Sequence, residues 1–368
     1  MKVKRVLKWG FLTILVAFIA WLFVGYWTST NDCEQITKNS THPMKAITSC
    51  EYGVDHLKLQ EIEKPMPADN EVLVRVRAAS VNPVDGHMIR DTWLARLFSG
   101  LRKPKNTRFG TDFAGVIEAI GKNVTDFKAG DEVFGAKNGA VAEHICVKMD
   151  RGIVMKPSNI TFEQAGSVGV AGLTALQGLR DKGRIQAGQK VLINGASGGV
   201  GTFAVQIAKS FGAEVTGVCS TRNVDLVKSI GADHVIDYTK EDFTKTDQRY
   251  DMIYDLVGNH SFSERQRILT PNGICVLAGV GGAGFRPESW GRVFGNFGAA
   301  FRSNFSKQKF IFYIAKLTKD DLNVLRDLMQ SGKVSPVIDR TYKLNQTVDA
   351  VRYLEEGHAR GKVVVNMD

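Results

Sequence analysis

The stretch Val191-Leu-Ile-Asn-Gly-Ala-Ser-Gly-Gly-Val-Gly201 joins a short apolar run to a turn built of small residues. Such a run is typical of a buried parallel strand. Apolar residues then recur at helical spacing as far as Phe211, and Gly212 can end the helix. Free backbone amides at the start of that helix predict a site for a dinucleotide pyrophosphate. The glycine spacing departs from G-x-G-x-x-G, so its place between strand and helix carries the prediction, and a turn without a ligand is the alternative.

The residues after the next expected strand indicate which dinucleotide binds. Residues 215–218 form that strand, and Ser220, Thr221 and Arg222 come at its end. An NAD-binding unit usually has an acidic residue there, which holds the ribose hydroxyls. Two hydroxyls and an arginine suit a 2′-phosphate instead, so we expect NADPH rather than NADH.

Strands and helices continue to alternate downstream. We expect a helix over 223–230 and strands over 234–238, 252–257 and 274–279. This alternation predicts an α/β fold with a doubly wound parallel sheet, the Rossmann arrangement.

The length of the chain indicates how many domains it can form, and the distribution of its charge bears on whether it binds nucleic acid. The 368 residues suffice for two domains with full cores. The net charge is +10, of which four positive charges lie within the first eight residues and the rest is dispersed. A denser basic stretch over 90–108 is not accompanied by a known nucleic-acid-binding module, so we expect no nucleic-acid partner.

The cysteines predict free thiols. None makes a C-x-x-C pair, and three fall in strand-like runs, where buried thiols are common. The five are Cys33, Cys50, Cys146, Cys219 and Cys275. We expect no disulfide framework and no zinc knuckle, which favours a reducing compartment.

The N-terminus predicts a membrane anchor. No charged residue lies between Lys8 and Asp32, and residues 11–26 are almost wholly apolar, long enough for a transmembrane helix. A cleaved signal peptide is the alternative, but no small-x-small cleavage site is found. Basic residues before the span favour export of the enzyme domain. A reduced nucleotide and free thiols favour the cytoplasm, and we expect a single-pass anchor with the domain on that side.

Four motifs carry a family resemblance. They are Ser80-Val-Asn-Pro-Val-Asp85, Gly110-Thr-Asp-Phe-Ala-Gly-Val-Ile117, Gly195-Ala-Ser-Gly-Gly-Val-Gly201 and Gly357-His-Ala-Arg-Gly-Lys-Val-Val364. From about Met44 to Met367 the chain resembles the zinc-free medium-chain dehydrogenase/reductases of the quinone oxidoreductase (zeta-crystallin-like) group. The resemblance implies a GroES-like β-barrel domain, a Rossmann domain and a homodimer. The expected divisions are 1–31 for the basic N-terminus and anchor, 32–43 for a linker, 44–165 for the GroES-like catalytic domain, 166–306 for the Rossmann NADPH-binding domain, and 307–368 for a return to the catalytic domain.

The resemblance also implies the cofactor contacts. The pyrophosphate would lie on the turn formed by Gly195, Ala196, Ser197, Gly198, Gly199, Val200 and Gly201. Ser220, Thr221 and Arg222 would hold the 2′-phosphate, and Tyr238 would lie beside the adenosine phosphate. Thr174 would lie near the nicotinamide half, and a loop from His358 to Arg360 would close over the cofactor. For Tyr238, Thr174, Arg222 and this loop, ordinary packing or solvation is the alternative.

The same likeness argues against zinc. Zinc-dependent relatives have a cysteine ligand where this chain has Asn82, and a Gly-His-Glu motif where it has 110–112. Tetrahedral zinc needs thiolate or imidazole ligands, so we expect no metal. The expected chemistry is hydride delivery to a quinone, enone or enal. We expect Asn82 to donate a hydrogen bond to the oxygen that gains charge. His87 and water are the candidates for the proton donor, and Asp85 is expected to be structural, holding the loop after Pro83.

Two segments combine aromatic and basic residues at helical spacing. They cover 91–108 and 294–307, and they suit interfacial helices, a pocket wall or a subunit contact. The alternative function from another class is a non-catalytic NADPH-binding membrane protein with a regulatory or structural role.

Overall fold

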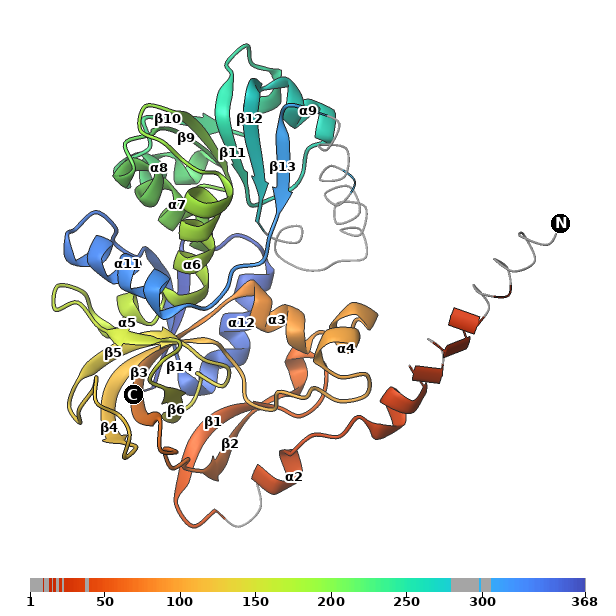
Figure 1. The fold of residues 1–368 in the computed structure, drawn as a ribbon, viewed down its shortest axis with the longest axis vertical. Helices are drawn as coiled ribbons and strands as arrows, with labels where there is room; N and C mark the ends of the chain where they lie inside the picture. Colours follow the sequence, from red (N-terminus) through yellow and green to blue (C-terminus); the bar gives the residue numbers. More distant parts are fainter. Residues whose placement is uncertain are drawn as a thin grey trace.

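The computed structural model describes residues 9, 13, 14, 16, 17, 20, 21, 23–36, 40–278, 298 and 306–367. Two large sheets form the body, and they occupy the upper and lower halves of Figure 1. The upper sheet is parallel throughout, whereas the lower sheet is mostly antiparallel. The fold class is therefore α/β, as expected.

The parallel sheet has the order β10-β9-β8-β11-β12-β13 among the residues described. Its strands are β8 (Lys190–Asn194), β9 (Glu214–Cys219), β10 (His234–Asp237), β11 (Tyr250–Asp255), β12 (Leu269–Leu277) and β13 (Lys309–Phe312). Counted along the chain, this order is the 3-2-1-4-5-6 of the Rossmann arrangement. The chain reverses direction across the sheet between β8 and β11, which is where such sheets bind ligands.

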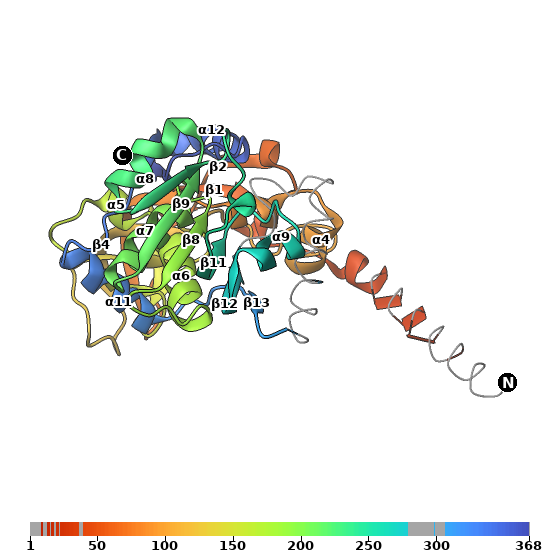
Figure 2. The same ribbon diagram turned by 90° about the horizontal axis from the view of Figure 1, so that it is seen from above.

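Helices cover both faces of this sheet. They are α6 (Gly169–Gln177), α7 (Gly199–Ser210), α8 (Val224–Ser229) and α9 (Phe262–Arg267), and α11 (Lys319–Gln330) packs against α6. Alternate residues of β8 belong to different cores: Val191 and Ile193 cluster with α7, whereas Leu192 clusters with residues on the α9 side. Figure 2 shows α7 and α9 on opposite sides of the strands. The continuous apolar run is thus explained by burial on both faces.

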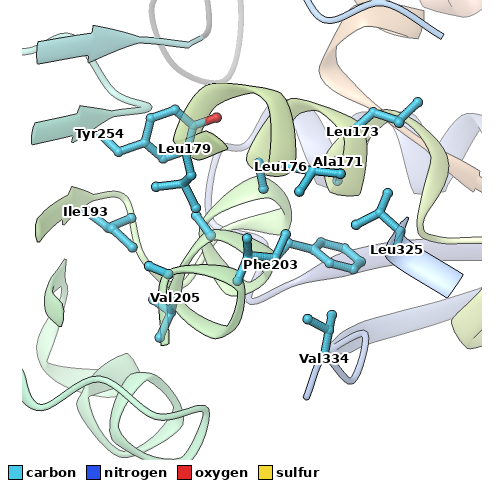
Figure 3. Packing of buried hydrophobic residues seen from close by; sticks show 14 of the residues in the cluster. Ala171, Leu173, Leu176, Leu179, Ile193, Phe203, Val205, Tyr254, Leu325 and Val334 are labelled. Atoms are coloured by element: carbon cyan, nitrogen blue, oxygen red, sulfur yellow. The ribbon is translucent and has the colours of Figure 1, made fainter. Parts of the chain in front are cut away.

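The larger core lies between the sheet and helices α6, α7 and α11. Leu176, Phe203 and Leu325, one from each helix, are fully buried and point toward one another in Figure 3. Apolar burial of this kind supplies about 25 cal/mol for each Å² removed from water. It holds α7, and therefore the turn before it, in a fixed position relative to β8.

The second sheet brings the C-terminus back to the N-terminal half. Its strands are β3 (Glu71–Val81), β4 (Asp112–Ile120), β5 (Glu132–Ala136), β6 (His144–Lys148), β7 (Ile153–Met155), β14 (Ile338–Lys343) and β15 (Lys362–Asn366). β15 pairs antiparallel with β3, opposite Val81 and Ser80. Its helices are α3 (Pro83–Ile89), α4 (Trp93–Ser99), α5 (Phe162–Ala165) and α12 (Thr347–Glu355), and β1 (Pro43–Ser49) pairs separately with β2 (Leu57–Glu63). The numbered domain boundaries stay predictions.

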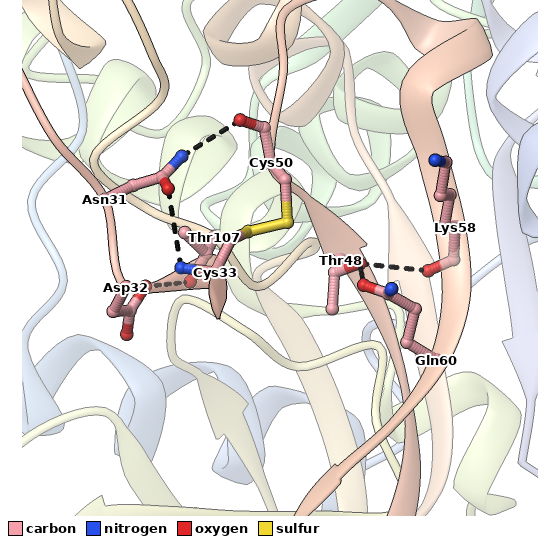
Figure 4. Close-up of a disulfide and its surroundings, with 8 residues drawn as sticks. All are labelled: Asn31, Asp32, Cys33, Thr48, Cys50, Lys58, Gln60 and Thr107. Carbon is pink, nitrogen blue, oxygen red and sulfur yellow. Dashed lines mark hydrogen bonds between the residues drawn. A yellow bond between two sulfur atoms is a disulfide. The ribbon is translucent and has the colours of Figure 1, made fainter. Parts of the chain in front are cut away.

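The expectation of free thiols is wrong for two cysteines. Cys33, which begins α2 (Cys33–Ile36), forms a disulfide with Cys50, and their Cα atoms lie 5.8 Å apart. Figure 4 shows the pair beside Asn31, whose amide donates to the Cys50 carbonyl at 2.9 Å. The expectation of a reducing compartment rested on five free thiols, and that basis does not hold for Cys33 and Cys50.

The described residues between Trp9 and Trp27 extend away from the body in Figure 1. Trp9 and Trp27, both helical, expose 61% and 62% of their surface. Among the residues that the structure describes, no helix is long and apolar enough to cross a bilayer. Within 91–108, the apolar residues expected on one helical face begin at Trp93, and α4 covers Trp93–Ser99. Except for residue 298 and the last two positions, the expected helix over 294–307 lies outside the described residues.

Candidate functional site

The turn between β8 and α7 is shaped by close backbone contacts. Gly195 has a φ of +90°, which favours glycine. A Cβ on Gly201 would lie 2.1 Å from the Gly195 carbonyl oxygen, so only glycine lets α7 approach the strand end. Gly198 caps the helix, and a Cβ there would meet only that same oxygen, at 3.5 Å. The open side of Gly198, beside the free amides of α7, fits a pyrophosphate.

Asn223 links this turn to the end of β9. Its Nδ2 donates to Ser197 Oγ at 3.0 Å and to Ser220 Oγ at 3.1 Å. Its Oδ1 is buried and accepts no hydrogen bond. A buried acceptor without a donor is costly, and a ribose hydroxyl of a bound nucleotide would satisfy it. Sequence analysis missed Asn223, although it directly follows the residues predicted to bind the 2′-phosphate.

The structure brings Arg222 and the C-terminal loop together. Arg222 Nη2 donates to the His358 carbonyl at 2.7 Å. Thr221 is engaged differently, since its hydroxyl donates to Asp237 Oδ2 at 2.6 Å. That hydrogen bond, with others from Thr239, lowers the pKa of Asp237 to about 2. Ser220 and Arg222 therefore remain the better candidates for the 2′-phosphate, while Thr221 holds a neighbouring carboxylate.

The outer predicted contacts lie at different places. Tyr238 follows β10, exposes 57% of its surface, and its amide donates to the Cys219 carbonyl at the end of β9. The Thr174 hydroxyl donates to the Val170 carbonyl within α6, at 2.7 Å. The Arg360 amide donates to Asp339, so the loop before β15 is tied to β14. Tyr238 thus lies near the predicted 2′-phosphate site, whereas the Thr174 hydroxyl is bonded within its own helix.

A buried polar cluster joins the two halves of the site. Asp112, at the start of β4, accepts from Ser80 Oγ at 2.9 Å, from Asn82 Nδ2 at 3.0 Å and from the Val170 amide at 2.7 Å. Lys362 Nζ donates to Asn82 Oδ1 at 2.5 Å and lies 3.3 Å from Asp112 Oδ2. Strands β3, β4 and β15 and helix α6 thereby meet around one carboxylate.

Asp85 occupies the same cluster from α3. Its carboxylate accepts from the Asn82 backbone amide at 2.8 Å and from the Thr111 hydroxyl at 2.6 Å, so it caps the start of α3, where a loop was expected. Burial raises its pKa to about 6, against the opposing effect of the Thr111 hydrogen bond. The second N–H of Asn82 also points to Asp85, at 3.3 Å. Both hydrogens on the side-chain Nδ2 of Asn82 are thus directed at carboxylates, one at Asp112 and one at Asp85.

His87 does not have the properties of a proton donor at neutral pH. Burial, with a smaller contribution from Arg90, lowers its pKa to about 4. The imidazole is therefore neutral at pH 7 and would have to give up a proton from its neutral form. In the parts of the chain that the structure describes, no three His, Cys, Asp or Glu side chains gather as a metal site would require.

Sequence analysis also missed Lys362. It lies in the quoted motif 357–364, but its spacing from Asn82 along the chain is 280 residues. Only the pairing of β15 with β3 brings the two together. No local pattern could have identified this contact.

Two family models match the chain. Residues 68–175 match the alcohol dehydrogenase GroES-like domain, and residues 230–365 match the zinc-binding dehydrogenase family. The first range covers Asn82, Asp85 and Asp112, and the second covers Lys362.

Characterised relatives and a solved structure extend over most of the chain. A 2-methylene-furan-3-one reductase of Solanum lycopersicum is 34% identical over 343 residues, covering 88% of this chain and 79% of its own. An NADPH-dependent alkenal/one oxidoreductase of Arabidopsis thaliana is 33% identical, covering 92% of this chain and 83% of its own. The quinone oxidoreductase from Coxiella burnetii has a similar structure, with a TM-score of 0.76 and 30% identity, covering 89% of this chain and 100% of its own.

Proposed function

This chain belongs to the zinc-free medium-chain dehydrogenase/reductases of the quinone oxidoreductase group, and from that membership we propose that it reduces quinones or α,β-unsaturated carbonyl compounds with NADPH. The observation that carries the proposal is the open glycine turn at the start of α7, beside a buried polar cluster from the second sheet. The relatives named as alkenal/one and quinone oxidoreductases support the acceptor class.

Different residues around the turn fit different parts of NADPH. The α7 amides and Ser197 would hold the pyrophosphate, and Asn223 would accept from a ribose hydroxyl. Ser220 and Arg222 would hold the 2′-phosphate, because guanidinium and hydroxyl groups donate to phosphate oxygens. When bound there, NADPH supplies the hydride.

The residues of the second sheet act on the acceptor end. Hydride addition to the β-carbon of an enone leaves negative charge on the carbonyl oxygen, which needs a hydrogen-bond donor. Asn82 was expected to be that donor, but its two N–H groups point to Asp112 and Asp85. We therefore assign Asn82 to the organisation of the cluster, and the proton to water, because His87 is neutral at pH 7.

We further propose that residues 1–31 attach the enzyme to a membrane, with the folded part on the oxidising side. The absence of charge between Lys8 and Asp32 supports attachment. The Cys33–Cys50 disulfide supports the oxidising side. The basic N-terminal residues favour the same orientation. A membrane location would favour lipid-soluble acceptors, and the homodimer implied by the family stays a prediction.

The function is tested by mixing the full-length protein in detergent with NADPH and a panel of quinones, enones and simple ketones. We expect NADPH to be oxidised in the presence of quinones or enones but not of saturated ketones. The oxidation is measured as the loss of nicotinamide absorbance. NADPH binding without oxidation across the whole panel would favour the non-catalytic alternative. Stronger binding of NADH than of NADPH would contradict the assignment of Arg222.

A further inference from the structure

A buried lysine lies where the two sheets meet. Lys362 begins β15, and its side chain is 3% exposed. An ammonium group buried this deeply is costly unless it is paired and hydrogen-bonded. Asn82 Oδ1 and Asp112 Oδ2 accept two of its three N–H groups. Among the described residues, no acceptor is found for the third N–H, whereas both side-chain N–H groups of Asn82 are directed at carboxylates.

The lysine also lies against the phosphate-binding turn. A Cβ on Gly199 would lie 3.1 Å from Lys362 Cδ, so the lysine stem passes beside the first residue of α7. Gly361 makes this path possible. Its φ is +122°, and a Cβ there would lie 2.4 Å from the Val337 carbonyl oxygen.

One short loop connects the lysine to the other end of the predicted cofactor site. Arg222, assigned to the 2′-phosphate, donates to the His358 carbonyl at the start of this loop. Lys362 stands at its end, bonded to Asn82. The start of α7 lies against Gly361 and Lys362, whereas Arg222 is assigned to the 2′-phosphate, so Lys362 is left for the nicotinamide side of the pyrophosphate.

We propose that Lys362 is a cofactor-binding residue whose ammonium donates to the phosphate nearest the nicotinamide of NADPH. The inference rests on the proposed function, which places the pyrophosphate at the turn. Phosphate oxygens accept charge-assisted hydrogen bonds from lysine. Because the same ammonium holds Asn82 and Asp112, it fixes the nicotinamide half relative to the second sheet.

A phosphate that binds beside this cluster needs a positive charge close to it. Asp85 and Asp112 are both buried beside Asn82, and their carboxylates would repel an incoming phosphate. Lys362 is 3.3 Å from Asp112 and offsets that charge at short range. In a low-dielectric interior, a charge this close has a large effect on an anionic ligand.

The test compares two ligands that share the adenine half. NADPH carries the nicotinamide-side phosphate, whereas adenosine 2′,5′-bisphosphate ends before it. Equilibrium binding of each is measured by calorimetry on the full-length protein and on Lys362→Met, Lys362→Arg and Arg222→Ala. The matched control is Lys209→Met, because Lys209 lies in the last turn of α7 and pairs with Asp233 away from the cluster.

We expect Lys362→Met to weaken NADPH by about 10- to 100-fold and adenosine 2′,5′-bisphosphate by less than about 2-fold. Lys362→Arg should retain most of the NADPH affinity. Arg222→Ala should weaken both ligands, and Lys209→Met neither. If Lys362→Met does not fold, because Asp112 is left unpaired, the double variant Lys362→Met/Asp112→Asn removes both charges and is compared with Asp112→Asn alone.

Equal affinities of wild type and Lys362→Met for NADPH would overturn the proposal, and so would equal weakening of both ligands. Neither result would affect the proposed function. That function fails instead if the wild-type protein binds no NADPH at all.

Discussion

At Asp85, burial and hydrogen bonding act on one carboxyl group in opposite directions. Burial is the larger effect and raises its pKa from 3.8 to about 6, although Thr111 and the Asn82 amide both donate to the carboxylate. The folded protein therefore holds a proton at pH values where the unfolded chain has lost it. Stability must fall as the pH rises through this interval.

The Asp85→Asn variant tests this directly. Wild type should lose about 2 kcal/mol of stability relative to the variant between pH 4.5 and pH 7, because the asparagine does not ionise. Urea unfolding of both proteins across that interval gives the difference. If the free energy of unfolding of wild type minus that of the variant stays constant or rises between pH 4.5 and pH 7, the raised pKa of Asp85 is contradicted.

Single residues were predicted where the local chain defines their role. The glycines of the turn and Arg222 follow expected strands, so their positions could be inferred from the strand ends. Lys362 could not, because its partners Asn82 and Asp112 lie 280 and 250 residues away. The partners of Asn82 could not be predicted for a similar reason, because they depend on how three strands meet.

At the scale of elements, the turn between β8 and α7 predicts a contrast between two glycines. Gly198→Ala should leave the melting temperature nearly unchanged, because the new Cβ meets only one atom, at 3.5 Å. It should weaken NADPH by at least about 10-fold, since the methyl group enters the space of the pyrophosphate. Gly201→Ala should destabilise the fold by about 2 kcal/mol or more, because its Cβ would lie 2.1 Å from a backbone oxygen.

Thermal unfolding and NADPH titration of the two variants check this contrast. Unchanged NADPH affinity in a well-folded Gly198→Ala protein would place the pyrophosphate elsewhere.

The disulfide between α2 and β1 should stabilise the N-terminal part of the fold. It closes a loop with a sequence separation of 17, for which chain entropy predicts about 3 kcal/mol. Cys50→Ser should therefore lower the melting temperature. A reductant should lower the melting temperature of wild type and leave that of the variant unchanged. Mass spectrometry after alkylation in denaturant should find three free thiols; five would contradict the pairing.

Elements were predicted best where both faces are buried. The apolar runs of β8, β9 and β11 gave strands within about two residues of those observed, because burial on both faces leaves a continuous pattern. The disulfide was missed because its two cysteines are brought together only by the path from α2 through β1. Within 91–108, α4 ends at Ser99 because Gly100, with a φ of +122°, follows it.

At the scale of the whole molecule, the disulfide and the N-terminal charges together predict on which side of a membrane the folded part lies. A protease admitted to the cytoplasm alone should leave the folded part intact while it degrades a cytoplasmic marker. Cleavage of the folded part under these conditions would place it in the cytoplasm and contradict the proposed orientation.

The return of β15 to β3 is the other feature of the whole molecule that matters for function. It places the end of the chain beside Asn82 and the start of α7, so both sheets contribute to one site. The family resemblance implied this return, whereas the contacts that it creates required the structure.

The central claim is that NADPH bound at the α7 turn gives its hydride to the β-carbon of an unsaturated carbonyl compound without a metal. The most direct test uses NADPH deuterated at the transferring position, with chelator-treated enzyme and a simple enone, and locates deuterium in the product by NMR. The account predicts deuterium on the β-carbon, at a rate that the chelator does not change. Deuterium on the carbonyl carbon, or activity that disappears with the chelator, would contradict it.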